Sequence, residues 1–114
     1  MTRLLVAGVD VGPVEVASTR AARRKGLLGR DGTNGAMAFP GINAVHTIGM
    51  RFPIDVAYCR AASADDRYEV IRVRTMPPRR IGLPVRRCTL VLEAEAGAFE
   101  RWGVRVGVQV ELRP

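Results

Sequence analysis

The sequence holds one histidine, His46, and acid–base chemistry on it would need a carboxylate brought close by the fold. Asp55 and Glu93 are the available carboxylates, because each follows an apolar residue inside a strand-like segment. Such a pair would suit a small hydrolase that uses His46 with a carboxylate as its general base. The side chains that could then act as the nucleophile are Thr47, Cys59 and Cys88.

Other interpretations of these residues stay open. Nothing in their spacing forces them together, and a lone histidine at a strand end is more often a hydrogen-bonded structural residue. His46, Asp55 and Glu93 could supply three metal ligands, but single residues scattered over a chain are not a metal-binding motif. We therefore predict no metal and no cofactor, and we assign no catalytic residue.

Arginine gives the chain its strong positive charge. Lysine and arginine number 18 against 11 acidic residues, a formal net charge of +7, and Lys25 is the only lysine. Three prolines exclude regular structure from residues 76–84, which lie in the most basic region. An anionic ligand would dock best on this candidate basic loop, through Arg79, Arg80, Arg86 and Arg87. Nucleic-acid binding is a third interpretation that we do not expect, because no basic run is interleaved with aromatic residues.

Short apolar runs bounded by glycine and proline predict many strands and few helices. Thr19 should cap a helix over residues 20–25, and residues 94–102 should form a second helix that ends at a glycine. A turn at Gly12-Pro13 should separate the first two strands. The expected strands cover residues 4–9, 14–17, 36–39, 43–47, 53–60, 68–74, 88–93 and 108–112. This pattern predicts a mainly β fold, a small antiparallel β sandwich or barrel with one or two short helices.

The length of 114 residues predicts a single domain over residues 1–114. Two cysteines are too few for a disulfide scaffold or a zinc site, so we expect buried free thiols, with one disulfide between strands as the alternative. No apolar stretch approaches the ~20 residues that cross a membrane, and the apolar start is too short for a secretory signal. We expect a soluble, cytoplasmic protein.

Several short motifs follow one another along the chain: GLLGR at 26–30, GAMAF at 35–39, VHTIGM at 45–50, PIDV at 53–56, VLE at 91–93 and GVRVG at 103–107. Their order resembles an uncharacterised prokaryotic family, domain of unknown function 192. The likeness covers about residues 14–112. It implies a compact, jelly-roll-like β domain with short helices and supplies no established activity. Many members place an aromatic residue and a Met-Lys-Asn-Thr run where this chain has residues 46–50, and Val108 replaces their usual acid.

The resemblance adds Arg30 to a candidate polar site that also contains His46, Asp55 and Glu93. In the structural interpretation, an arginine pairs with an inward-facing acid and fixes a loop against the sheet. In the functional interpretation, the four residues form a pocket for a small anionic or sugar-like ligand. The leading hypothesis is therefore a non-catalytic module that binds a ligand or a protein partner, and the hydrolase is the alternative.

Overall fold

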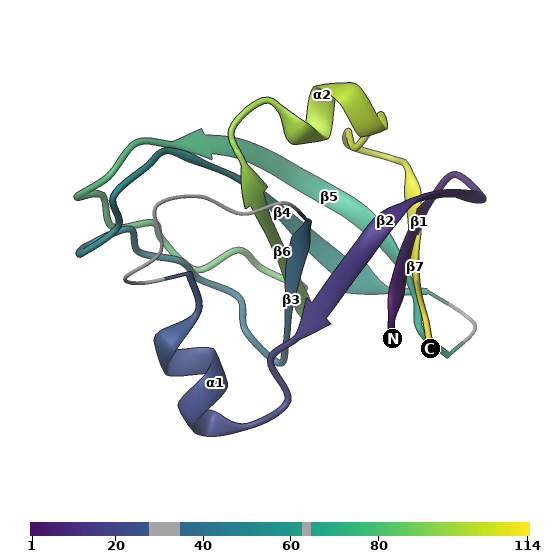
Figure 1. Ribbon diagram of the computed structural model, residues 1–114, viewed down its shortest axis with the longest axis horizontal. Coiled ribbons are helices and arrows are strands. Elements are labelled where there is room, and N and C mark those ends of the chain that lie inside the picture. Colours follow the sequence, from purple (N-terminus) through teal and green to yellow (C-terminus); the bar gives the residue numbers. More distant parts are fainter. Residues whose placement is uncertain (28–34, 63–64) are drawn as a thin grey trace.

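The computed structural model describes residues 1–27, 35–62 and 65–114. Seven strands and two short helices follow one another along this part of the chain (Figure 1). They are β1 (Arg3–Val6), β2 (Val9–Val16), α1 (Arg20–Lys25), β3 (Ala36–Pro40), β4 (Ile54–Ala61), β5 (Arg67–Met76), β6 (Leu90–Glu95), α2 (Ala98–Trp102) and β7 (Gln109–Arg113). The mainly β fold with two short helices is confirmed.

The strands close into a barrel in the order β1-β2-β3-β6-β4-β5-β7. All neighbours are antiparallel except β2 and β3, which run parallel, so the barrel is mixed rather than wholly antiparallel. Parallel neighbours need a crossover connection, and the chain that leaves β2 passes through α1 before it enters β3. Figure 1 shows α1 and α2 on opposite sides of the barrel, and no described helix is long and apolar enough to cross a membrane.

The first reversal of the chain lies earlier than the sequence suggested. The predicted turn at Gly12-Pro13 is wrong, because β2 runs through both residues. The chain reverses instead at Ala7 and Gly8, whose φ angles of 50° and 83° fit a tight two-residue hairpin. The register of the β1–β2 pairing shifts beside Gly12. Leu4 pairs with Gly12 but Leu5 pairs with Asp10, so β2 has one extra residue at this point, as in a β-bulge.

Residues 43–47 do not form the predicted strand. They make one isolated antiparallel bridge, between His46 and Ile81. The backbone N–H of Thr47 donates to the Arg80 carbonyl at 2.7 Å, and the Gly82 N–H donates to the Val45 carbonyl at 2.8 Å. Residues 43–47 therefore form a loop on the barrel surface, the crossing loop, which is hydrogen-bonded to the candidate basic loop. A turn at residues 48–49 follows within the same loop.

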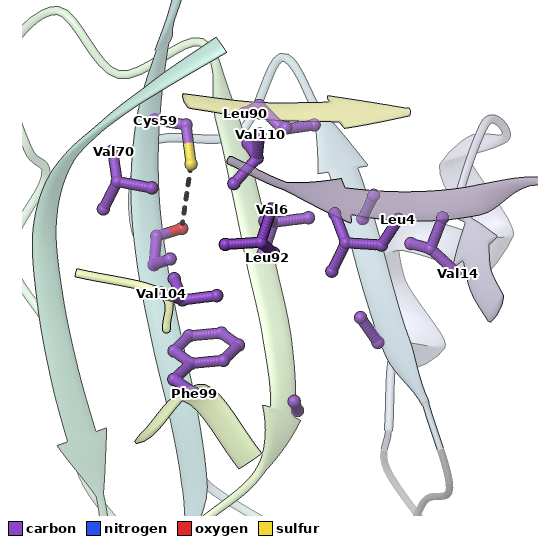
Figure 2. Packing of buried hydrophobic residues seen from close by; sticks show 14 of the residues in the cluster. Leu4, Val6, Val14, Cys59, Val70, Leu90, Leu92, Phe99, Val104 and Val110 are labelled. Atoms are coloured by element: carbon purple, nitrogen blue, oxygen red, sulfur yellow. Dashed lines mark hydrogen bonds between the residues drawn. The ribbon is translucent and has the colours of Figure 1, made fainter. Parts of the chain in front are cut away.

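An inner core fills the barrel. Figure 2 shows side chains from strands on different sides pointing toward one another, with Leu92 and Val6 at the centre. Phe99 of α2 enters this core from one end, beside Val104. The inner core consists of Leu4, Val6, Val14, Ala36, Ala38, Ala57, Cys59, Val70, Leu90, Leu92, Ala94, Ala98, Phe99, Val104, Val110 and Leu112.

A second, outer core covers the opposite face of β3, β4 and β6. Its strand residues alternate in sequence with those of the inner core, as the two faces of a strand require. Ile54, Val56 and Tyr58 of β4 share this face. The outer core consists of Ala17, Leu27, Met37, Phe39, Val45, Met50, Phe52, Ile54, Val56, Tyr58, Met76, Cys88 and Val91. Both cysteines are buried free thiols, as expected, and they lie in different cores.

Candidate functional site

Asp55 holds the start of α2 against the barrel. It is 4% exposed, and one carboxylate oxygen accepts a hydrogen bond from the Thr75 hydroxyl at 2.7 Å. The other oxygen accepts from the backbone N–H groups of Gly97 at 2.9 Å and Phe99 at 3.1 Å. Gly97 adopts a φ of 96°, which glycine tolerates best, and this turn aims both N–H groups at Asp55. The carboxylate thus satisfies backbone donors at a helix start, which is a structural role.

Glu93 lies on the opposite face of the sheet from Asp55. In the β4–β6 pairing, Asp55 is opposite Ala94 whereas Val56 is opposite Glu93. Residues that pair across antiparallel strands project from the same face, so Asp55 faces the inner core and Glu93 faces the outer core. The structure therefore does not bring these two predicted site residues together.

Glu93 lines a pocket and has no polar partner in the described part of the chain. Glu93 is 8% exposed, and no hydrogen bond or ion pair joins its carboxyl group to any described side chain or backbone group. Burial, which disfavours the charged form, raises the pKa of Glu93 from 4.5 to about 7. At neutral pH the group therefore exists as a mixture of acid and carboxylate, able both to donate and to accept a hydrogen bond.

The pocket beside Glu93 has a volume of about 140 Å³ and opens to solvent. Residues 25–27 at the end of α1 form one wall, and the crossing loop forms another with Val45 and His46. Phe39, Ile42 and Met50 make most of the remaining surface apolar. Among its described lining residues, Lys25, His46 and Glu93 are charged or titratable, so the pocket combines an apolar lining with a few polar groups, as ligand sites commonly do.

His46 and Glu93 are thus the two predicted site residues that one pocket contains. His46 is exposed and belongs to the bridge with Ile81, which sets its position at the pocket rim. Arg30, the third predicted member, lies outside the described residues. Asp55 lines a separate hollow with α2.

Thr47 anchors the crossing loop and is not available as a nucleophile. Its side chain is fully buried, and its hydroxyl donates to the Pro77 carbonyl at 2.7 Å. The same oxygen accepts from the Arg80 N–H at 2.8 Å. Burial raises the pKa of both Cys59 and Cys88, which keeps them as unreactive thiols. None of the three predicted nucleophiles lines the pocket.

The four arginines of the candidate basic loop separate into two pairs. Arg79 and Arg80 lie in the part of the loop that Thr47 holds through its hydrogen bonds to Pro77 and Arg80. The Arg80 guanidinium donates to backbone carbonyls of its own loop at 3.5 Å. Arg86 and Arg87 instead line a hollow over β4 and β5, together with Arg60 and Arg72. No group of three His, Cys, Asp or Glu side chains within residues 1–27, 35–62 and 65–114 could hold a metal ion.

Sequence reasoning missed Tyr58, which lies on the same face as Glu93. Tyr58 is opposite Val91, so it is a diagonal neighbour of Glu93 across the β4–β6 pair. Its hydroxyl is buried without a hydrogen-bond partner among the described groups. Burial raises the pKa of Tyr58, and the nearby Glu93 charge adds to that rise. Two polar groups without described partners therefore lie near each other, a feature that only the pairing register reveals.

Comparisons with known proteins agree with the fold. A crystal structure of a protein of unknown function from Novosphingobium aromaticivorans DSM 12444 is similar, with 25% identity, a TM-score of 0.74, and coverage of 96% of this chain and 83% of that one. A second, from Sinorhizobium meliloti 1021 and described as a candidate transcription regulator, has 24% identity, a TM-score of 0.76, and coverage of 97% and 91%. The second likeness supports the fold alone.

The search of curated proteins found no match. The family model DUF192, described as an uncharacterised ACR, matches residues 5–112. That range covers nearly the whole chain: it contains β2 to β6 completely, the second half of β1, and β7 up to Leu112. The resemblance drawn from the sequence motifs is thereby confirmed. The chain belongs to the DUF192 family.

Proposed function

We propose that this protein is a non-catalytic binding module whose pocket takes a small, uncharged polyhydroxyl ligand. The single observation that carries the proposal is the carboxyl group of Glu93, which is nine-tenths buried, lines the pocket and has no described hydrogen-bond partner. Buried polar groups in proteins are nearly always hydrogen-bonded, so one that faces a pocket is a natural partner for a ligand.

The state of this carboxyl group favours hydroxyl groups over anions. Because burial raises the pKa of Glu93 to about 7, the group offers both a donor and an acceptor near neutral pH. A ligand hydroxyl can match either form, whereas an anion would be repelled by the carboxylate form. The apolar wall of Leu27, Phe39 and Ile42 would contact the C–H face of a sugar-like ring.

The size of the pocket limits what can enter it. About 140 Å³ is smaller than the ~300–1,000 Å³ typical of sites for drug-sized ligands. We therefore expect a small polyol or the end group of a larger saccharide. His46 at the rim would supply a further hydrogen bond.

Nuclear magnetic resonance tests the proposal with named probes. A ¹⁵N-labelled sample would be titrated with glycerol, myo-inositol and glucose at pH 6 and pH 8. The expected result is shifts confined to residues 25–27, 42–46 and 93. Glu93→Leu should abolish the shifts, and the matched variant Glu95→Leu, two residues along the same strand and exposed, should keep them. Shifts spread over the surface, or equal shifts in both variants, would contradict the proposal.

A hydrolase is the second candidate, because a carboxyl group with a pKa near 7 and a histidine line the same pocket. It would use Glu93 and His46 as general acid and base on water, since no predicted nucleophile reaches the pocket. Assays with p-nitrophenyl esters and glycosides check it. Turnover that Glu93→Gln removes and Glu95→Gln retains would favour the enzyme over the binding module.

A further inference from the structure

A second hollow, which shares no described lining residue with the pocket beside Glu93, is strongly basic. It lies over the outer surface of β4 and β5 and has a volume of about 610 Å³. Arg60 and Arg72 come from the two strands, whereas Arg86 and Arg87 come from the segment that precedes β6. Four arginines separated by up to 27 positions in the sequence therefore converge on one concave surface.

Most of this positive charge is not neutralised by the described residues. Arg60 forms an ion pair with Glu69, which also lines the hollow. No ion pair within the described ranges involves Arg72, Arg86 or Arg87, and all three are exposed. Three guanidinium groups are thus free to form two-pronged hydrogen bonds with carboxylates, which match the guanidinium fork in shape.

Apolar side chains lie beside the arginines. Ile71, Pro84 and Val85 line the same hollow. Leu83, next to Pro84 in the chain, is 75% exposed although it is a large aliphatic residue. A partner that only neutralised charge would leave this aliphatic surface in water, whereas a partner with both acidic and apolar side chains would cover it.

We propose that this arginine hollow is a docking surface for an acidic peptide segment of a partner protein, one that presents carboxylates together with an aliphatic side chain. The carboxylates would pair with Arg72, Arg86 and Arg87. The aliphatic side chain would pack on Val85 and Leu83. This surface is separate from the pocket of the proposed function, and neither proposal depends on the other.

The lining of the hollow favours a peptide over a nucleic acid. Single strands bind best where bases stack on aromatic rings, and the hollow has no aromatic residue among its described lining residues. Reading a duplex requires an element that projects into a groove, but these arginines line a concavity.

Fluorescence anisotropy tests the proposal with the whole chain. The probe is a labelled dodecapeptide of eight glutamates and four leucines, measured at 50 mM and 200 mM salt. The comparison ligands are an all-glutamate dodecapeptide, a twelve-nucleotide poly-dT strand and vesicles containing phosphatidylserine. We expect the mixed peptide to bind more tightly than each of these, with affinity that weakens as salt increases.

Charge-matched variants locate the binding surface. Arg86→Gln with Arg87→Gln should weaken peptide binding about tenfold or more. Arg101→Gln with Arg105→Gln removes the same charge from exposed positions near α2 and should change it less than about twofold. Leu83→Ser should lower affinity for the mixed peptide to that for the all-glutamate peptide. Equal losses in both double variants, no peptide binding, or tighter binding to poly-dT or vesicles would overturn the proposal.

Discussion

Asp55 and Glu93 lie on neighbouring strands and are hidden from water to nearly the same degree, yet their surroundings differ completely. Asp55 accepts three hydrogen bonds, from Thr75, Gly97 and Phe99. Glu93 accepts none from the described residues and borders a pocket instead. The register that sets Asp55 against Ala94 and Val56 against Glu93 sends the two acids to opposite faces of one sheet.

The difference teaches how to tell a structural acid from an available one. Burial alone does not distinguish them, because both residues are less than a tenth exposed. What distinguishes them is whether the fold supplies donors. Asp55 receives its donors from a glycine turn and a helix start, so replacing Asp55 should lower the free energy of unfolding. No described group donates to Glu93, so ionisation of its carboxyl group should lower the free energy of unfolding. A bound ligand that donates a hydrogen bond to Glu93 would offset that loss.

Replacing Asp55 should produce the largest effect. Asp55→Ala leaves the Thr75 hydroxyl and two backbone N–H groups without their acceptor, so the free energy of unfolding should fall by about 3–5 kcal/mol. Urea denaturation followed by circular dichroism measures this change. Asp65→Ala, at an exposed position, should change it by less than about 0.5 kcal/mol. Similar losses in the two variants would remove the structural role of Asp55.

Glu93 should affect stability through pH. Since the pKa of Glu93 is raised from 4.5 to about 7, the folded state keeps a proton that the unfolded state has lost between these values. Stability therefore falls as the pH rises through this window and levels off above it, by roughly 3 kcal/mol. Glu93→Gln should lack this fall, as denaturation curves at pH 4.5, 6 and 8 would show. A parallel pH dependence in the two proteins would mean that Glu93 ionises normally when folded.

Thr47 should have an intermediate effect, because it anchors the loop that forms the pocket wall. Thr47→Val keeps the shape but leaves the Pro77 carbonyl and the Arg80 N–H without their partner, at a cost of about 2 kcal/mol. The control Thr89→Val changes an exposed threonine and should cost less than about 0.5 kcal/mol. Thermal denaturation compares the two, and equal melting temperatures would argue against the anchor.

Tyr58 should show the smallest effect. Its buried hydroxyl has no described partner, so Tyr58→Phe removes a polar group that gains nothing from the fold. The free energy of unfolding should stay within about 1 kcal/mol of the wild type, or rise. A loss of more than about 2 kcal/mol in urea denaturation would indicate a hydrogen bond to the Tyr58 hydroxyl.

Local parts of the fold could be predicted from the sequence. Thr19 does cap α1, accepting from the Ala22 N–H at 3.0 Å, because a cap depends only on nearby residues. Alternation along a strand likewise puts Tyr58 on the same face as Val56, as observed in the outer core. The turn at Ala7 and Gly8 was missed because Ala-Gly is a weaker turn signal than the Gly-Pro that follows it.

The candidate site was harder to predict, since it depends on contacts between distant segments. Asp55 binds N–H groups 42 and 44 residues away, and no local pattern announces that pairing. Glu93 and His46 line one pocket, whereas Asp55, which the sequence analysis grouped with them, faces the other side of the sheet. A strand pattern gives the face of a residue only relative to its own strand, so the sequence could not separate them. Lys25 and Leu27 joined the pocket only through the position of α1.

The pKa of the Glu93 carboxyl group tests the central claim most directly. It can be measured from the ¹³C chemical shift of the side-chain carboxyl carbon in a labelled sample titrated from pH 3 to pH 9. A buried group without described hydrogen-bond donors should titrate with a midpoint near 7. A midpoint at or below 4.5 would mean that the folded protein stabilises the carboxylate, and Glu93 would then be a second structural acid like Asp55.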